Sequence, residues 1–262
     1  MENSKIKRAL LIILDGVGIG PSGDNNGWTL ADTPNIDLLL KDYPSAAIEA
    51  SGENVGLPKY QMGNSEVGHM IIGSGKIFKQ DLVIINEAIE DSSFFSNEAI
   101  LNAIFSAKEN NSSLHLLGLA SPGGVHSHIN HLLSILKICK SYGISPKLHL
   151  FTDGRDSDPK SSIEILDNLD KYLKEYGGEI YTISGRYYAM DRDQRWSRTE
   201  LAWDAIVNNK GETGKDYLDV INSSYAKGIT DEFILPTSLS CAKPLEKMDS
   251  LLFFNFRNDR TR

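Results

Sequence analysis

Short apolar runs alternate with longer amphipathic segments along most of the chain. The apolar runs end in glycine or in charged residues, and the segments that follow have the length and spacing of helices. Strands of a parallel sheet are apolar throughout because helices cover both of their faces. We therefore expect an α/β fold of three layers, with a parallel sheet between two layers of helices. The predicted strands are Ala9–Leu14, Leu114–Leu119, Leu148–Thr152, Glu179–Ser184 and Leu251–Phe256.

Start and stop signals predict four helices, which begin at Pro34, Leu132, Pro159 and Ser197. Asp158 is expected to cap the third helix, because Pro159 suits the first helical position through its fixed φ. That helix is expected to end at Gly177, since glycine commonly follows the last helical turn. Ser197 and Glu200 have the spacing of a capping box for the fourth helix.

Glycine and polar residues concentrate in two stretches, residues 16–26 and 52–75. Both stretches are too long for tight connections, which favours functional loops or a domain border. The regular rhythm of strands and helices resumes only after residues 73–80. We therefore expect a domain boundary in that segment.

The overall charge limits the partners of the chain. Its 262 residues carry 27 Lys and Arg against 35 Asp and Glu, a formal net charge of −8. This balance argues against general binding to nucleic acid or to anionic membranes, so any bound anion needs a local cluster of cations. Two cysteines, Cys139 and Cys241, provide neither a disulfide framework nor a multi-cysteine metal site. The apolar block before Asp15 is too short for a signal peptide or a membrane span, so we expect a cytoplasmic protein.

Asp15 and Ser65 are the first candidates for chemistry. Asp15 follows a predicted strand, where α/β sheets bind their ligands, so it suits a metal ligand or a catalytic carboxylate. A loop aspartate that caps a turn is an equal alternative. Ser65 lies among small residues and could begin a helix, whose free amides stabilise phosphate or an alkoxide. An ordinary N-cap serine followed by Glu66 is the alternative there.

Histidines cluster after the predicted strand that ends at Leu119. His126, His128 and His131 are half of the six histidines in the chain. His128 and His131 suit the beginning of a helix, so we expect only His126 to be functional.

Arginines follow three of the predicted strands: Arg155, Arg186, Arg192, Arg257 and Arg260. The carboxyl ends of parallel strands meet at one edge of a sheet, so these side chains are expected to converge. A guanidinium binds phosphate or carboxylate through two hydrogen bonds, which favours a small substrate with two anionic groups. The alternative is a set of surface ion pairs with nearby aspartates, namely Asp153, Asp156, Asp191, Asp193 and Asp259.

Seven segments resemble, in the same order, the cofactor-independent (2,3-bisphosphoglycerate-independent) phosphoglycerate mutases, metalloenzymes of the alkaline phosphatase superfamily. They are LDGVGIG, ADTPNID, QMGNSEVGH, GGVHSH, FTDGRD, SGRYYAMDRDQRW and FFNFRNDR. The resemblance implies a phosphatase-like metal domain, built from both ends of a full-length chain, with an inserted α/β domain that binds substrate. Residues 1–78 are then the first part of the metal domain, and residues 79–262 are most of the inserted domain.

The resemblance also implies an activity in glycolysis and gluconeogenesis, the interconversion of 3-phosphoglycerate and 2-phosphoglycerate by a monomer. The reaction would pass through a phosphoserine and use two divalent metal ions, usually manganese. Ser65 matches the residue that accepts the phosphoryl group, and Asp15 and Ser65 match ligands of one metal ion. The positions that match substrate-binding residues are His126, Arg155, Asp156, Arg186, Arg192, Arg257, Asn258, Asp259 and Arg260.

One part of the family's pattern is missing from the sequence. In the family, further aspartate and histidine metal ligands and a lysine of the substrate cleft follow the last matched arginine. The sequence ends at Arg262, so we expect a fragment that lacks mutase activity by itself. Two other functions stay open: a module that binds small phospho-acids, and a hydrolase of the same superfamily.

Overall fold

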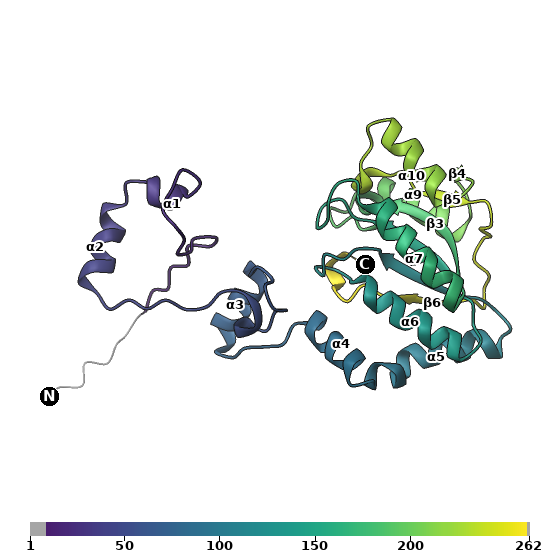
Figure 1. Ribbon diagram of the computed structural model, residues 1–262, viewed down its shortest axis with the longest axis horizontal. Helices are drawn as coiled ribbons and strands as arrows, with labels where there is room; N and C mark the ends of the chain where they lie inside the picture. The colour runs from purple at the N-terminus through teal and green to yellow at the C-terminus, as the bar shows by residue number, and fades with distance from the viewer. Residues whose placement is uncertain (1–8, 261–262) are drawn as a thin grey trace. The chain divides into compact units, whose positions relative to one another are not determined.

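The structure is a computed structural model that describes residues 9–260, apart from the side chain of Asn258. The chain divides into two compact units, Met1–Lys79 and Gln80–Arg262 (Figure 1). In the described residues, the larger unit contains the β-sheet and the smaller unit consists of helices and loops. The division lies at residues 79 and 80, within the segment where the rhythm of strands and helices resumes.

A six-stranded sheet forms the centre of the described part of the larger unit. Its strand order is β4-β5-β3-β2-β1-β6, and all neighbouring strands are parallel except β3 and β5. The strands are β1 (Leu114–Leu119), β2 (Lys147–Thr152), β3 (Glu179–Gly185), β4 (Glu212–Gly214), β5 (Thr237–Leu239) and β6 (Ser250–Phe253).

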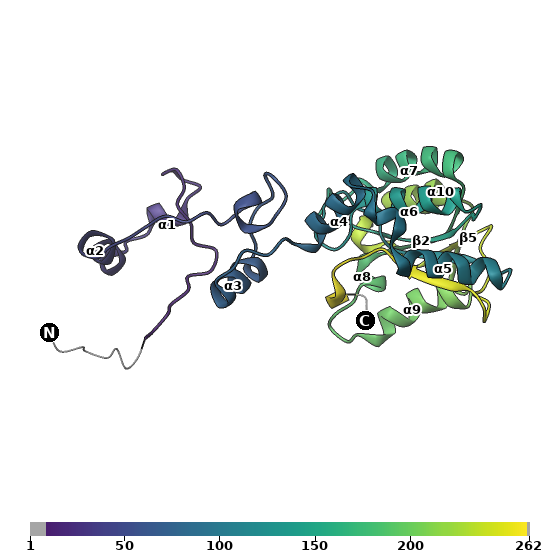
Figure 2. The ribbon, with the colours of Figure 1, turned by 90° about the horizontal axis from the view of Figure 1, so that it is seen from below.

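Helices cover both faces of the sheet. They are α4 (Asp81–Glu90), α5 (Glu98–Glu109), α6 (Ile129–Ser141), α7 (Ser162–Tyr176), α8 (Arg186–Ala189), α9 (Trp196–Val207) and α10 (Tyr217–Ala226). Figure 2 shows α6, α7 and α10 on one side of the sheet and α8 and α9 on the other. Three short 3-10 helices, η2 (Ser93–Ser96), η3 (Asp231–Phe233) and η4 (Asn258–Arg260), complete the described part of this unit.

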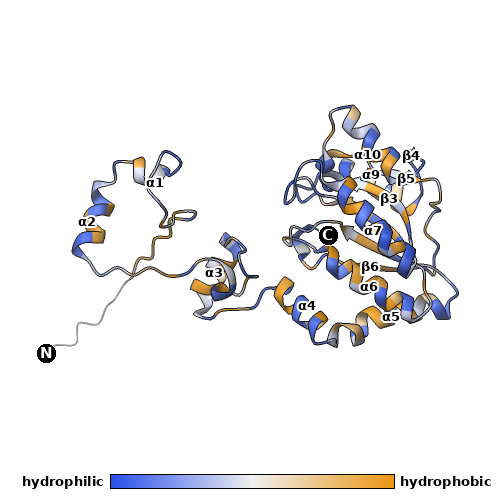
Figure 3. Cartoon of the chain, in the orientation of Figure 1, coloured by the Kyte–Doolittle hydropathy of each residue, from blue (hydrophilic) through white to orange (hydrophobic). Residues whose placement is uncertain are grey.

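The side chains of β1 explain why the sheet is buried on both faces. Leu114 and Leu116 pack into the larger core, which also contains side chains of α5, α6, α7 and α10. Leu117 and Leu119 point to the opposite face and join a smaller core with Ile206 of α9. The helices α5, α6 and α7 carry both polar and apolar surfaces, as the two colours in Figure 3 show. The three-layer α/β fold expected from the sequence is confirmed.

The smaller unit contains α1 (Gly27–Leu30), α2 (Pro34–Asp42), η1 (Gly52–Val55) and α3 (Ser65–Ser74). Its buried core is small, with Val55, Leu57 and Val67 at the centre. The strand predicted at Ala9–Leu14 is wrong, because the structure has no strand in the described residues of this unit. Leu10, Leu11 and Ile12 are 85%, 70% and 72% exposed. An apolar run becomes a strand only where a neighbouring strand accepts its backbone hydrogen bonds.

Four of the five predicted strands are present. β1 coincides with its predicted range, and β2 and β3 differ from theirs by one residue. β6 ends at Phe253, earlier than the predicted Phe256. β4 and β5 were not predicted, because three residues are too few to show a hydrophobic period. The antiparallel pairing of β5 also corrects the expectation of a wholly parallel sheet.

Three predicted helix starts are wrong. α6 begins at Ile129 rather than at Leu132. α7 begins at Ser162, and the carboxylate of Asp231 accepts hydrogen bonds from the amides of Ser161 (2.9 Å) and Ser162 (3.0 Å). A residue distant in sequence therefore satisfies the amides that Asp158 was expected to cap. α9 begins at Trp196, so Ser197 lies inside the helix rather than at its cap. None of the described helices is long and apolar enough to cross a membrane.

Candidate active site

The parallel strands β1, β2, β3 and β6 end at the same edge of the sheet, and each continues into a loop or helix that carries predicted site residues. The side chains that contact one another there are His126, Asp156, Arg186, Arg192, Arg257 and Asp259. The convergence expected from the strand ends is therefore present. We call this group, together with Arg155 and Arg260, the arginine edge.

Arg186 is the buried centre of the arginine edge. Its Nη1 lies 2.6 Å from Asp153 Oδ1 and 2.5 Å from Asp156 Oδ2. Burial alone would lower the pKa of Arg186, but the hydrogen bonds to Asp156 and Asp153 outweigh this effect and raise it. The guanidinium is therefore charged and held by two carboxylates.

Asp153 lies at the centre of these contacts, although the sequence suggested it only as a partner in a surface ion pair. It is 1% exposed at the end of β2, and its Oδ2 accepts a 2.5 Å hydrogen bond from Ser121 Oγ. Its Oδ1 accepts hydrogen bonds from the amides of Arg155 (3.2 Å) and Asp156 (3.1 Å). Burial would raise the pKa of Asp153, but the hydrogen bonds from Ser121, Asp156 and Arg186 outweigh it, so the pKa is lowered. Asp153 fixes both the Arg186 guanidinium and the turn that carries Arg155 and Asp156.

His126 lies between two carboxylates. Its Nε2 is 3.9 Å from Asp156 Oδ2, and its Nδ1 is 3.6 Å from Asp259 Oδ1. Burial and the charges of Arg186 and Arg257 lower the pKa of His126 to about 4, although Asp259 and Asp156 act in the opposite direction. The imidazole is therefore neutral near pH 7, with one nitrogen as a hydrogen-bond donor and the other as an acceptor.

The neighbouring histidines have structural roles, as expected. The Nδ1 of His128 caps α6 by accepting a hydrogen bond from the amide of Asn130 at 3.2 Å. His131 lies in α6, and its Nε2 is 2.9 Å from Asn86 Oδ1.

Three further arginines pair with carboxylates. Arg155 Nη1 lies 3.4 Å from Glu232 Oε1. Asp259 is shared, since its Oδ2 lies 3.6 Å from Arg192 Nη1 and its Oδ1 lies 3.0 Å from Arg257 Nε. The side chain of Asn258 lies outside the described residues.

Arg260 is held differently from the other arginines. Its Nη1 donates a hydrogen bond to the carbonyl of Met190 at 3.3 Å, and its Nε is buried without a hydrogen-bond partner among the described residues. Burial and the nearby charges of Arg192 and Arg186 lower the pKa of Arg260, with Arg155 adding to the effect and Asp259 opposing it. Positive charge therefore accumulates around an unsatisfied guanidinium donor, which is the environment that an anionic ligand neutralises.

Asp15 and Ser65 contact each other in the smaller unit. Ser65 Oγ donates a 2.7 Å hydrogen bond to Asp15 Oδ2, and it lies 3.1 Å from His69 Nδ1. The cap of α3 is Asn64, whose Oδ1 accepts a hydrogen bond from the amide of Val67 at 3.0 Å. Ser65 is therefore the first residue of α3 rather than its N-cap, and its hydroxyl is available for other chemistry. His69 was not singled out from the sequence, although its position one helical turn after Ser65 indicates this contact.

The two oxygens of Asp15 and Ser65 fit a divalent cation only in part. Oxygen donors suit ions such as manganese or magnesium, and the proton between these oxygens is the one that a cation would displace. Such ions take about six ligands. Within residues 9–260, no group of three or more His, Cys, Asp or Glu side chains could hold a metal ion. These two residues therefore provide part of a ligand set.

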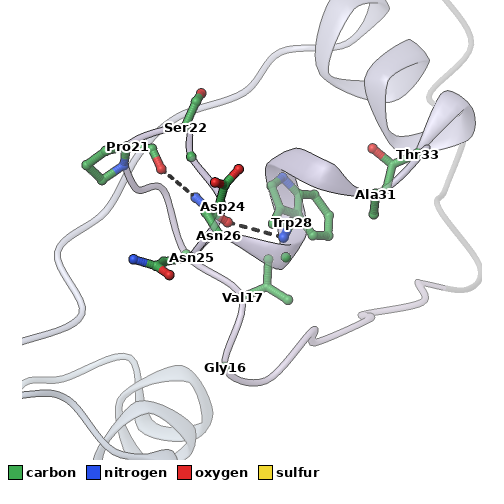
Figure 4. Close-up of a pocket in the computed structure, with 13 residues that line it drawn as sticks. Gly16, Val17, Pro21, Ser22, Asp24, Asn25, Asn26, Trp28, Ala31 and Thr33 are labelled. Carbon is green, nitrogen blue, oxygen red and sulfur yellow. Dashed lines mark hydrogen bonds between the residues drawn. The ribbon is translucent and has the colours of Figure 1, made fainter.

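The polar loop after Asp15 lines an open pocket of about 840 Å³ within the smaller unit (Figure 4). Asn26 holds this loop together, since its Nδ2 donates to the carbonyl of Pro21 at 2.9 Å and its Oδ1 accepts from the amide of Trp28 at 3.1 Å. None of the predicted site residues lines this pocket.

Two family models match the chain. The one described as "BPG-independent PGAM N-terminus" matches residues 85–262, and the one described as "Metalloenzyme superfamily" matches residues 7–124. The two matches overlap and together extend over most of the chain.

Relatives and a solved structure give the same result. The 2,3-bisphosphoglycerate-independent phosphoglycerate mutase of Clostridium tetani is 51% identical, over 98% of this chain and 51% of the relative. That of Parabacteroides distasonis is 50% identical, over 98% of this chain and 52% of the relative. The phosphoglycerate mutase of Leishmania mexicana, with crystal structures at low cobalt concentration, has a TM-score of 0.83 and 32% identity, over 95% of this chain and 48% of that one. The chain spans about half the length of the curated relatives it matches. It belongs to the 2,3-bisphosphoglycerate-independent phosphoglycerate mutase family.

Proposed function

We propose that this chain is the part of a phosphoglycerate mutase that binds 3-phosphoglycerate and 2-phosphoglycerate at the arginine edge and supplies Ser65 as the phosphoryl acceptor. The observation that carries the proposal is the buried, unpartnered Nε of Arg260 beside the charges of Arg192 and Arg186. Phosphate and carboxylate groups accept hydrogen bonds from such donors. The names of the relatives support the choice of phosphoglycerate among small anions.

Some guanidiniums of the arginine edge are free to turn toward the substrate, and others are held in place by carboxylates. Arg186 is neutralised by Asp153 and Asp156, so it shapes the site more than it attracts an anion. The ion pairs of Arg192 and Arg155 are long, at 3.6 Å and 3.4 Å, and both arginine side chains are more than half exposed. Surface pairs of this kind are weak, so these two guanidiniums can turn from their partners to a phosphate or a carboxylate. Neutral His126 can hydrogen-bond a glycerate hydroxyl without adding charge.

Phosphoryl transfer is proposed to occur at Ser65 Oγ. A bond forms between Oγ and the phosphorus, and the bond between the phosphorus and the glycerate oxygen breaks. The leaving glycerate oxygen receives the proton that Ser65 gives up, and Asp15 already accepts the hydrogen bond of that hydroxyl. The phosphoryl group then returns to the other glycerate oxygen, which regenerates Ser65. Positioning and charge neutralisation provide most of the catalysis in such transfers.

A divalent metal ion at Asp15 and Ser65 would lower the pKa of the serine hydroxyl and neutralise charge on the phosphoryl group. We propose two such ions, manganese in the first place, with further ligands supplied by segments of the full-length enzyme. We also propose a cytoplasmic monomer with a role in glycolysis and gluconeogenesis, and without nucleic-acid or membrane partners. The proposed domains are residues 1–78 as part of the metal domain and residues 79–262 as the substrate domain.

Calorimetric titration of the 262-residue chain with 3-phosphoglycerate tests the binding half of this proposal. We expect saturable binding that Arg260→Met weakens by about ten- to a hundredfold, the contribution of one charge-assisted contact. Lys227→Met is the matched control, because it removes one exposed positive charge after α10. Equal weakening by the two variants would indicate a general charge effect and would contradict a specific site at Arg260.

A mutase assay with manganese tests the catalytic half, in a full-length enzyme that contains these residues. Ser65→Ala should abolish the conversion of 3-phosphoglycerate to 2-phosphoglycerate, and undiminished turnover would exclude Ser65 as the acceptor. Release of inorganic phosphate without 2-phosphoglycerate would favour a hydrolase instead.

A further inference from the structure

The loop between α8 and α9 carries Arg192, and a single buried carboxylate organises it. The side chain of Asp191 is 2% exposed. Its Oδ2 accepts hydrogen bonds from the amides of Asp193 at 3.1 Å and Arg195 at 2.9 Å. Its Oδ1 accepts a 3.1 Å hydrogen bond from Arg198 Nη1. One side chain therefore joins the loop to the first turns of α9.

Arg198 is itself fixed by an aromatic ring. Its guanidinium carbon lies 3.7 Å from the centre of the Tyr187 ring, close enough for a cation–π contact. The Tyr187 ring packs against Phe233 of η3, with ring centres 5.0 Å apart. Tyr187 belongs to α8 and Arg198 to α9, so the contact connects the two helices at either end of the loop.

The backbone of this loop depends on such support. Gln194 has a φ of 58°, a left-handed conformation that residues other than glycine adopt at a cost. The two amides that donate hydrogen bonds to Asp191 are those of Asp193 and Arg195, and they flank Gln194. The carboxylate therefore offsets the strain of Gln194 by satisfying the amides on both sides of it.

Arg192 has little else to hold it in place. Its side chain is 52% exposed, and its ion pair with Asp259 is long, at 3.6 Å. The position of its guanidinium therefore depends on the conformation of the loop. Met190, the residue before Asp191, also touches the arginine edge, because its carbonyl accepts the hydrogen bond from Arg260.

We propose that Asp191 is a positioning residue whose carboxylate, paired with Arg198, holds the 191–195 loop so that Arg192 faces the anionic substrate. This inference rests on the proposed function. The sequence suggested Asp191 as a neutralising partner of the site arginines, but its contacts are with Arg198 and backbone amides, whereas Arg192 lies against Asp259.

The positioning role and a simple charge effect predict opposite results. Asp191→Asn removes a negative charge near an anion site, which by Coulomb attraction alone would tighten the binding of an anion. Loss of the contacts of Asp191 with Arg198 would weaken anion binding instead, because Arg192 would no longer be held facing the substrate. Asp193→Asn is the matched control, since Asp193 is an exposed carboxylate two residues away in the same loop.

The test is calorimetry of the 262-residue chain with 3-phosphoglycerate. Asp191→Asn should weaken binding by about ten- to a hundredfold, whereas Asp193→Asn should leave it within about threefold of the parent or tighten it. Gln194→Gly in the Asp191→Asn background should restore part of the affinity, because glycine adopts a positive φ without strain.

Hydrogen exchange of the loop provides a readout that does not need a ligand. The amides of Asp193 and Arg195 should exchange at least about tenfold faster in Asp191→Ala than in the parent chain, as hydrogen-bonded amides do when they lose their acceptor. If the parent binds 3-phosphoglycerate and the two asparagine variants bind it equally, the positioning role is wrong and the proposed function stands. If the parent does not bind, the proposed function is wrong and the positioning role is lost with it.

Discussion

Replacing Asp153 with asparagine tests how the buried charge of Arg186 is stabilised. Arg186 is 3% exposed and Asp153 is 1% exposed, and they are joined by a 2.6 Å contact. Removing one partner of a buried ion pair costs about 3–5 kcal/mol, because the other charge stays in a medium that solvates it poorly. Asp156 still lies 2.5 Å from the same guanidinium. We therefore expect the lower end of that range, a loss of about 3 kcal/mol in the free energy of unfolding.

Urea unfolding of the 262-residue chain at pH 7 measures this loss, with Asp156→Asn as the control. The side chain of Asp156 is 21% exposed, so water can replace part of its interaction with Arg186. We expect the control to lose about 1 kcal/mol. An Asp153→Asn loss below 1 kcal/mol, or an equal loss in the control, would refute the assignment of Asp153 as the main anchor.

The pH dependence of the unfolding free energy tests the same ion pair between Asp153 and Arg186. The pKa of Asp153 is below its ordinary value of 3.8 in the folded state, so its ionised form stabilises the fold above that pH. As the pH falls through the lowered pKa, the parent chain loses this stabilisation. The difference in unfolding free energy between the parent and Asp153→Asn should therefore shrink below about pH 4.

Two further predictions concern stability. Burial lowers the pKa values of His126 and His131 to about 4 and that of His149 to about 3, so the unfolded chain binds protons below pH 6.5 that the folded chain does not. The free energy of unfolding should fall by about 2 kcal/mol per histidine from pH 7 to pH 5, and a flat urea profile would contradict these shifts. Gly185→Ala should cost about 3 kcal/mol, because a Cβ there would lie 2.3 Å from the carbonyl oxygen of Glu232. Thermal melting against Gly73→Ala, where a Cβ meets open space and the backbone is helical, should show the smaller shift for the control, and equal shifts would be inconsistent with this packing.

The sequence predicted strands correctly where the described residues include neighbouring strands that pair with them. β1 was predicted residue for residue because it is paired on both sides and is mostly apolar and buried throughout. The run Ala9–Leu14 is also apolar but has no neighbouring strand in the described residues, so its pattern was misleading. The start of α7 failed for a related reason, because its amides are satisfied by Asp231, about seventy residues away.

The candidate site was predictable to a similar extent. Arg155 and Arg186 could be assigned to one edge of the sheet, because the order of strands and loops is visible in the sequence and parallel strands end at the same edge. The partners of each arginine could not be predicted. Asp153 and Asp191 look alike in the sequence, yet one neutralises Arg186 and the other supports a loop. This difference depends on tertiary packing.

The most direct test of the account is the location of bound phosphoglycerate. The nuclear magnetic resonance signals of the arginine Nε–H groups can be followed while 3-phosphoglycerate is added to the 262-residue chain. We predict the largest shift at Arg260, whose Nε gains a partner, with smaller shifts at Arg192 and Arg155. Unchanged arginine signals together with shifts around the cavity of about 310 Å³ that Lys174 and Lys215 line would contradict the account, because the anion would then bind elsewhere.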